Sequence, residues 1–376
     1  MIKRDLTLQL TPSPITTKVH FGHEILYSQA WVETLSSLKK KLVTIADSHI
    51  QSLLVDKWAA FLKKQGVTVT KLTFPSGEES KTREMKERLE DELFAHHCGK
   101  DTAIIAIGGG VATDLAGYVA STFCRGVPFL CIPTTLLCMV DAVIGGKTGV
   151  NTPFGKNLIG TYYPADHILI DTTTLSTLPD REWRNGLAEI IKHGLILSPK
   201  LFQKLIDGHS KWVKKDPEFL QEVIYDSFLI KKDVVEADFQ ENGYRRILNF
   251  GHTVAHAIEL LENYRIAHGE AVAVGMLAEA NLSHRLGLLD KTVCEQIEHV
   301  LKLFEFPLAI SDKLTFENLY GAMMLDKKSK NAKPRFVLLE AIGSPAAFNG
   351  AYCTAIDDAI LQEVIISTLS QFRGIR

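Results

Sequence analysis

The first half of the chain alternates short apolar runs with amphipathic stretches that repeat at helical spacing. The apolar runs have the length of strands, and they predict strands at residues 42–47, 67–74, 102–107, 129–132 and 167–170. The periodic stretches predict helices at 51–64 and 80–96, and a third helix that begins near Thr113. Apolar strands separated by helices indicate a mostly parallel sheet with helices on both faces.

The pattern changes near residue 179, after which strand signals almost disappear. Helices are predicted at 182–197, 201–213, 219–237, 253–263, 270–286 and 291–303. One further strand is expected at 335–339. We therefore predict an α/β domain over residues 1–179 and a mainly helical domain over residues 180–376.

The composition fits such a two-domain protein and excludes several classes of function. With 44 acidic and 42 basic residues, the chain has no overall charge that would attract nucleic acid or an acidic membrane. Its six cysteines are scattered without a Cys-x-x-Cys pair, which indicates buried reduced thiols rather than disulfides or zinc ligands. The sequence has neither the apolar core of a signal peptide nor a run of about 18 apolar residues, so we expect a cytoplasmic location.

Several residues suited to ligand binding follow the predicted strands directly. Asp47, the run 108–110 of three glycines, and the pair Thr134 and Thr135 stand at strand carboxyl ends, where ligands of parallel sheets bind. The glycines would let backbone amides approach a pyrophosphate, although a simple tight turn is an equally good interpretation. The run lacks the Gly-x-Gly-x-x-Gly fingerprint, because Thr113 occupies the place of its third glycine.

The stretch 141–157 contains glycines, two lysines and two asparagines without a helical pattern. Its Gly-Lys-Thr at 146–148 imitates the end of a P-loop, but Asp141 stands where the first glycine of that motif is required. We interpret the stretch as a polar loop that could cover a phosphorylated ligand. A solvated surface loop is the alternative.

In the second half, the segment from Arg245 to His256 carries the strongest chemical signal. A helix after Gly251 would place His252, His256 and Glu259 on one face. Imidazoles four residues apart suit a zinc ion, although capped surface histidines are common in such a pattern. Arg245 and Asn249 are suited to binding anions and favour a functional site.

A carboxylate in an apolar helix is the second signal of this half. Glu189 and Lys192 share a helix face among apolar neighbours, so burial is favoured over a surface ion pair. A buried carboxylate needs a cation, and a metal would serve. Lys231, with Glu236 on a later helix, and the charged run 326–328 are compatible with solvated surfaces.

Taken together and in order, these motifs resemble the 3-dehydroquinate synthase family of sugar phosphate cyclases. The resemblance extends over about residues 47–343 and rests on the segments 108–114, 125–128, 133–135, 140–141, 145–148, 155–157, 186–192, 248–252, 268–270 and 326–328. It implies a Rossmann-like NAD-binding domain, a helical metal-binding domain, and an active site in the cleft between them.

The resemblance implies a divalent metal bound by Glu189, His252 and His268, rather than by the pair His252 and His256 that spacing alone suggests. Three protein ligands leave positions open, as a catalytic zinc site requires, and cobalt is an alternative. His256 is assigned to chemistry or to a contact with the substrate phosphate.

The second cofactor that the resemblance implies is NAD. The contacts carried over to this sequence are Asp47, Glu78, Lys81, Gly109, Gly110, Val111, Asp114, Thr134, Thr135, Lys147, Lys156, Asn157 and Thr177. The chain departs from the family pattern at Thr113, where many relatives have glycine, and at Met139, where glutamine is more usual. We expect Thr113 to add a side chain beside the cofactor without preventing binding.

The implied substrate is 3-deoxy-D-arabino-heptulosonate 7-phosphate, which becomes 3-dehydroquinate and phosphate in the shikimate pathway. The implied route is transient oxidation at C5 by NAD, β-elimination of phosphate, re-reduction, ring opening and aldol closure. The residues assigned to this chemistry are Lys147, Lys192, Lys231, Arg245, Asn249, His256, Asp141, one of Lys327 and Lys328, and Arg125, which is donated across a homodimer interface.

Three alternatives stay open at this stage. A sister cyclase would use a different sugar phosphate, but Arg245, Asn249 and Lys231 together favour a substrate with a carboxylate. A metal-dependent polyol dehydrogenase would release NADH, and a non-catalytic nucleotide-binding module would retain no metal.

Overall fold

The computed structural model describes residues 15–308, 311, 314–325 and 333–372. Its first half is built on a six-stranded sheet, in which every neighbouring pair of strands is parallel. The strands follow the order β1 (Lys18–Gly22), β8 (His167–Asp171), β5 (Phe129–Pro133), β4 (Thr102–Gly108), β2 (Lys41–Asp47) and β3 (Val69–Phe74). The predicted strands are confirmed to within two residues at each end.

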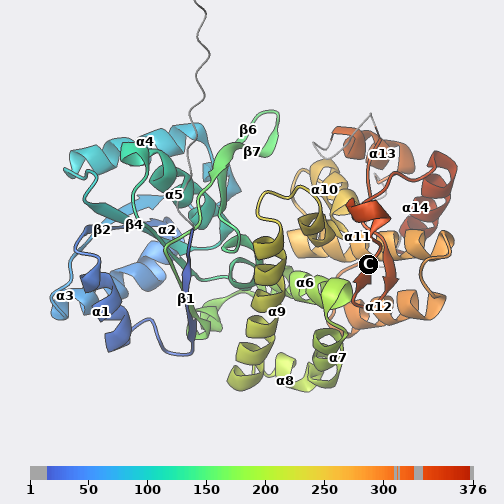
Figure 1. Cartoon of the computed structure of the whole chain (residues 1–376), viewed down its shortest axis with the longest axis horizontal. Coiled ribbons are helices and arrows are strands. Elements are labelled where there is room, and N and C mark those ends of the chain that lie inside the picture. The colour runs from blue at the N-terminus through green and yellow to red at the C-terminus, as the bar shows by residue number, and fades with distance from the viewer. Residues whose placement is uncertain (1–14, 309–310, 312–313, 326–332, 373–376) are drawn as a thin grey trace, which may run out of the picture.

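Helices cover both faces of this sheet, as the alternating pattern predicts (Figure 1). On one face, α1 (Gln29–Ser37) and α3 (Asp56–Lys64) pack their buried tryptophans against the strands. On the other face lie α4 (Arg83–Ala95) and α5 (Gly110–Thr122), in a core that continues into the second half of the chain. The predicted helix at 51–64 is helical throughout, but it begins with α2 (Ser48–Ile50) and a π-helical turn at Gln51–Val55.

The connections create a switch point between β2 and β4. From β2 the chain goes outward to β3, and it then returns to place β4 on the other side of β2. The carboxyl ends of β2 and β4 therefore lie side by side while their connections diverge, which opens a crevice for a ligand.

Two elements of the first half differ from the prediction. Strand β1 was missed, because its Lys-Val-His-Phe-Gly sequence lies at a sheet edge and lacks the apolar run of a buried strand. The stretch expected to be a polar loop forms the hairpin of β6 (Lys147–Thr152) and β7 (Gly155–Tyr162). Glycines allow the two strands to approach, since a β-carbon at Gly160 would lie 1.9 Å from the Thr148 carbonyl oxygen.

The second half is mainly helical, as predicted, and no described helix is long and apolar enough to cross a membrane. Its helices are α6 (Asp180–Leu197), α7 (Pro199–Asp207), α8 (His209–Val213), α9 (Pro217–Ala237), α10 (His252–Leu261), α11 (His268–Arg285), α12 (Lys291–Leu303), α13 (Phe316–Leu325) and α14 (Asp358–Phe372). Helix α11 is buried along most of its length and contacts α6, α10, α12 and α14.

Some details of the second half were wrong or missed in the prediction. The stretch 201–213 is interrupted at Gly208 and forms α7 and α8. The strand expected at 335–339 is limited to a bridge at Phe336 and to β9 (Leu339–Ala341), which pairs with β10 (Ser344–Pro345). Helices α13 and α14 were not predicted.

Candidate cofactor and metal site

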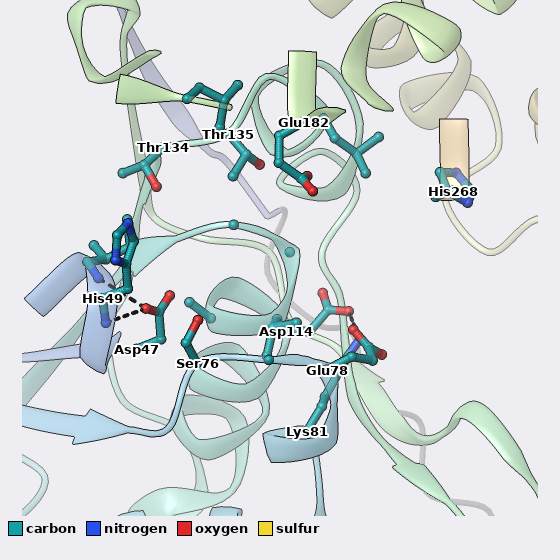
Figure 2. A pocket seen from close by; sticks show the side chains of 18 of the residues that line it. Asp47, His49, Ser76, Glu78, Lys81, Asp114, Thr134, Thr135, Glu182 and His268 are labelled. Atoms are coloured by element: carbon teal, nitrogen blue, oxygen red, sulfur yellow. Dashed lines mark hydrogen bonds and ion pairs between the residues drawn. The ribbon is translucent and has the colours of Figure 1, made fainter. Parts of the chain in front are cut away.

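A cavity of about 1250 Å³ lies between the carboxyl ends of the parallel strands and the helices α6, α10 and α11. Figure 2 shows Asp47, Thr134 and Asp114 on one wall and His268 on the opposite wall. All the predicted cofactor contacts except Lys147 line this cavity. The crevice at the switch point is thus one end of a larger space that both halves of the chain enclose.

The glycine turn after β4 brings backbone to the cavity. Gly108 has a φ of +150°, and a β-carbon there would lie 2.7 Å from Cβ of Ala112. Helix α5 begins at Gly110, so the amides of its first turn face a cavity lined by Gly109, Gly110 and Val111. A helix N-terminus with exposed amides favours a negatively charged ligand.

Asp47 is the last residue of the neighbouring strand β2. Its Oδ1 accepts hydrogen bonds from the amides of His49 at 2.9 Å and Ile50 at 3.0 Å, which caps helix α2. The carboxylate is fixed by these bonds while the residue still lines the cavity. The capping bonds thus hold the Asp47 carboxylate at the carboxyl end of β2.

A buried lysine connects the sheet to the β6–β7 hairpin. Lys81 donates to Asp114 Oδ2 at 2.5 Å and to Asn157 Oδ1 at 2.6 Å. Glu78 accepts a bond of 2.7 Å from Asn151 in the same hairpin. Burial raises the pKa of Asp114, and the positive charge of Lys81 only partly offsets this effect.

The two departures from the family pattern are both directed into the core. Thr113 is buried, does not line the large cavity, and bonds to the carbonyl oxygen of Gly110 at 3.2 Å and to Cys138 Sγ at 3.6 Å. The expectation that Thr113 adds a side chain beside the cofactor is therefore wrong, because its hydroxyl turns back onto the helix. Met139 is fully buried among apolar side chains.

On the helical side, three helices bring Glu189, His252 and His268 together. Oε1 of Glu189 lies 3.5 Å from Nε2 of His252 and 3.5 Å from Nε2 of His268. Donor atoms about 2.1 Å from a tetrahedral zinc ion are separated by about 3.4 Å, so the spacing fits such an ion. Oε1 is buried and makes no hydrogen bond to the described residues, which leaves its lone pairs available to a cation.

Each of the three side chains also has a polar contact on the side that faces away from the shared centre. The carbonyl of Phe250 faces Nδ1 of His252 at 3.1 Å, and Glu259 Oε1 faces Nδ1 of His268 at 3.3 Å. Lys192 donates to the second carboxylate oxygen of Glu189. Such outer contacts fix the orientation of metal-ligating groups.

The charges of these neighbouring side chains shift one another's pKa values. Burial would raise the pKa of Glu189, but Lys192 and the two histidines hold it well below its usual range. Burial, followed by the charge of Lys192, lowers the pKa of His252. Burial also disfavours the charged form of His268, but the facing carboxylates outweigh this and raise its pKa to about 10.

The start of α10 depends on a close approach of two helices. Gly251 has a φ of +80°, and its amide donates to the buried carboxylate of Glu279 at 2.8 Å. A β-carbon at Gly275 of α11 would lie 1.9 Å from the Gly251 carbonyl oxygen. Helix α10 can therefore begin at His252 only because α11 carries no side chain at this point.

Cationic side chains cluster next to the three-ligand group. Lys231 is buried and donates to the side chain of Asp141 and, at 2.7 Å, to its backbone carbonyl. The positive charge of Lys231 lowers the pKa of Asp141, although burial alone would raise it. Arg245 is also buried and donates to the Phe239 carbonyl at 2.6 Å, in space that Gly145 leaves open.

One residue of this region was missed by the sequence reasoning. Glu241 accepts hydrogen bonds from Lys147 and from Asn249, at 2.8 Å in the second case, so it joins two predicted substrate contacts. It lies in a polar turn with a φ of 61°, where an acidic side chain is normally solvated. The sequence therefore carried no signal that could have found it.

The remaining predicted residues fall in three places. His256 lines the cavity, and its ring centroid lies 5.5 Å from that of His252. Arg125 is exposed in a turn with positive φ and does not line the cavity within one chain. Lys327 and Lys328 lie outside the described residues.

Comparison of the sequence with known proteins identifies the family to which the chain belongs. Residues 71–185 match the family described as "3-dehydroquinate synthase N-terminal", and residues 186–329 match "3-dehydroquinate synthase C-terminal". A 3-dehydroquinate synthase of Nitrosospira multiformis is 39% identical over 362 residues, which cover 96% of this chain and 97% of the relative. The chain belongs to the 3-dehydroquinate synthase family.

Solved structures of two related cyclases have the same fold. A 2-deoxy-scyllo-inosose synthase complexed with carbaglucose-6-phosphate, NAD+ and Co2+ is 30% identical, with a TM-score of 0.82 over 92% of this chain and 95% of the other. A 2-epi-5-epi-valiolone synthase from Streptomyces hygroscopicus subsp. jinggangensis 5008, with NAD+ and Zn2+ bound, is 27% identical. Its TM-score is 0.87 over 97% of this chain and 99% of the other. The 3-dehydroquinate synthase fold of this chain is thus an α/β half joined to a helical half.

Proposed function

We propose that this protein is the NAD- and divalent-metal-dependent lyase of its family, a 3-dehydroquinate synthase. Its substrate would be 3-deoxy-D-arabino-heptulosonate 7-phosphate, and its products 3-dehydroquinate and phosphate. The observation that carries this proposal is the group of Glu189, His252 and His268 between an NAD-sized cavity and a buried cationic cluster. Identity of 39% to a curated 3-dehydroquinate synthase across nearly the whole chain supports it.

The cavity and the three-ligand group beside it suit two bound groups. Glu189, His252 and His268 would hold zinc or cobalt, and the glycine turn with Asp47 and Asp114 would hold NAD. When bound, the metal supplies a Lewis acid for substrate hydroxyls, and NAD supplies a hydride acceptor that is regenerated within each turnover. The side chain of Glu259 would keep His268 in position, and that of Lys192 would keep Glu189 in position.

The cationic cluster suits a substrate with two anionic groups. Arg245 is buried, and its guanidinium is held by a hydrogen bond to the Phe239 carbonyl, so it is preorganised to bind a carboxylate. Lys147, Lys192, Lys231 and Asn249 would bind the substrate's remaining oxygens, with Asp141 and Glu241 orienting them. His256, one helical turn after His252 and in the cavity wall, would contact the phosphate.

A sister cyclase is the second candidate, because both solved relatives named above are cyclases of other sugar phosphates. Their identity to this chain is lower, at 30% and 27%, than the 39% of the 3-dehydroquinate synthase. The buried Arg245 also favours a carboxylated substrate over a neutral sugar ring.

The function is tested by supplying the purified protein with NAD+, zinc and the heptulosonate phosphate. We expect phosphate release that a chelator abolishes and that is accompanied by no net increase in nicotinamide absorbance at the end of the reaction. Accumulating NADH would instead support a polyol dehydrogenase. Phosphate release from a different sugar phosphate alone would support a sister cyclase.

Other parts of the assignment are proposals of the same kind. We propose a domain boundary at residues 179 and 180, where α6 begins. We also propose a homodimer in which Arg125, exposed in the single chain, reaches the partner's site. A cytoplasmic location stays a prediction.

A further inference from the structure

The β6–β7 hairpin and the turn after α10 meet at the edge of the cavity. Nζ of Lys156, near the tip of the hairpin, lies 3.7 Å from the centroid of the Tyr264 ring. Both residues line the cavity, and they come from the two different halves of the chain. In Figure 1 the hairpin rises from the α/β half beside α10. This contact therefore joins the cofactor wall to the helical wall.

The position of Tyr264 is fixed by the metal side. Asn263 and Tyr264 have φ values of 49° and 59°, so the chain turns sharply after α10. The Tyr264 amide donates to the carbonyl of Glu259 at 2.8 Å, and the carboxylate of the same Glu259 faces His268. Glu259 therefore links the Tyr264 ring to His268, one of the three proposed metal ligands.

The position of Lys156 is fixed by the cofactor side. The next residue, Asn157, accepts a bond from Lys81 and donates its amide to Asn151 at 3.0 Å. These bonds hold the hairpin backbone against the pair of the buried Lys81 and the partly buried Asp114. With the backbone fixed, the contact with the Tyr264 ring is then sufficient to orient the Lys156 ammonium.

Lys156 is held differently from the other lysines of the site. Lys81, Lys147, Lys192 and Lys231 each form an ion pair with a carboxylate. Among the described residues, Lys156 forms no such pair and lies over a ring face instead. A carboxylate partner would neutralise the charge, whereas an aromatic face orients an ammonium and leaves its charge available to an anion.

We propose that Tyr264 is a positioning residue for NAD binding, which holds the Lys156 ammonium at the cavity edge ready for an anionic group of the cofactor. The inference rests on the proposed NAD site. A free lysine side chain loses rotamer freedom when it binds, and the ring removes part of that cost before the cofactor arrives.

The test is a double-mutant cycle on the full-length protein, with NAD+ affinity measured by calorimetry in the absence of sugar phosphate. Tyr264→Leu should weaken NAD+ binding by about two- to five-fold, the range of an exposed cation–π contact. Tyr264→Phe retains the ring and should bind like the parent. In the Lys156→Met background, Tyr264→Leu should have no further effect.

Three results would overturn the proposal. They are an equal effect of Tyr264→Leu in both backgrounds, an equal loss in the Phe and Leu variants, and tighter NAD+ binding by the Leu variant. Metal content and thermal unfolding of each variant separate a positioning role from damage to the turn. Failure of phosphate release with normal NAD+ binding would reject the synthase function and leave this cycle valid. A parent protein that does not bind NAD+ would reject both.

Discussion

The two walls of the cavity achieve similar precision by different means. The cofactor wall consists of turns after parallel strands, where Gly109 and Gly110 present backbone and Asp47 caps a helix. Behind the helical wall, Glu189, His252 and His268 converge from separate helices, and of these three residues only His268 lines the cavity. We expect ligand binding at a wall of backbone groups to depend less on any single side chain than metal binding by a convergent group of three. The predictions below test this difference, beginning with the largest effect.

The three-ligand group should lose its metal completely when one of its side chains is removed. His252→Ala should lower the metal content from about one ion per chain to near zero and abolish turnover, since two ligands cannot hold the ion. Metal analysis after dialysis and phosphate release measure the two effects. NAD+ affinity should change little, because the cofactor wall is built separately.

His256→Ala is the matched control for this change. His256 lies one helical turn away and outside the three-ligand group, so the variant should retain its metal even if turnover falls. An active, metal-free His252→Ala protein would contradict the ligand assignment.

On the cofactor wall, the vulnerable point is the buried lysine rather than the glycine turn. Lys81→Met should lower the free energy of unfolding by about 2 kcal/mol, because it leaves the partly buried Asp114 without its cation. Lys71→Met is the control, since the pair of Lys71 and Asp56 is exposed, and it should cost less than about 1 kcal/mol. Denaturant unfolding measures both. Equal losses would mean that burial does not distinguish the two pairs.

Loss of a side chain from the buried cationic cluster should affect substrate binding more than chemistry. Arg245→Ala should raise KM by about 10- to 100-fold, the loss of one charge-assisted hydrogen-bond partner. The neighbouring Arg246 donates to the Ala351 carbonyl at 3.4 Å and provides the control. Steady-state kinetics measure the effect. An equal loss on an analogue that lacks both carboxylate and phosphate would show that Arg245 has no role in binding anions.

The smallest effect concerns pH and a histidine next to the cationic cluster. Burial, followed by the charge of Lys192, lowers the pKa of His193 to about 3, and its Nδ1 lies 2.8 Å from the Ser227 hydroxyl. Between pH 6.5 and 3 the unfolded chain takes up a proton that the folded chain refuses, so stability falls as pH falls. The slope should approach about 1.4 kcal/mol per pH unit within that window and vanish above it.

His193→Asn removes this titration while it retains a polar side chain beside Ser227. Its unfolding free energy should depend less on pH than that of the parent between pH 6 and 4. Parallel pH dependences of the two proteins would show that other groups cause the acid sensitivity.

The cofactor wall was largely predictable, because its residues follow strands whose apolar runs are visible in the sequence. Asp47, the glycine turn and Thr134 line the cavity as strand ends of a parallel sheet should. The β6–β7 hairpin was not predicted, since its pairing depends on close glycine contacts rather than on an apolar pattern.

The helical wall was less predictable from residue patterns alone. Spacing on one helix suggests His252 with His256, whereas the structure groups His252 with residues of α6 and α11. Helix crossing decides which faces meet, and it depends on contacts such as that of Gly251 with Gly275. Residue patterns indicate a cation at Glu189, but only the resemblance to a family supplied His268 and grouped it with Glu189 and His252. Neither approach supplied Glu241.

The pairing of β1 has a consequence for how the protein is made on the ribosome. Among the strands that the structure describes, β1 pairs only with β8. The last residue of β8, Asp171, also accepts hydrogen bonds from the amides of Glu24 at 3.0 Å and Leu26 at 2.7 Å. A nascent chain can join β2 to β5 as they emerge, but its β1 segment must wait until nearly 150 further residues have been translated. During folding, the amides of β1 should therefore be among the last in the sheet to become protected from hydrogen exchange.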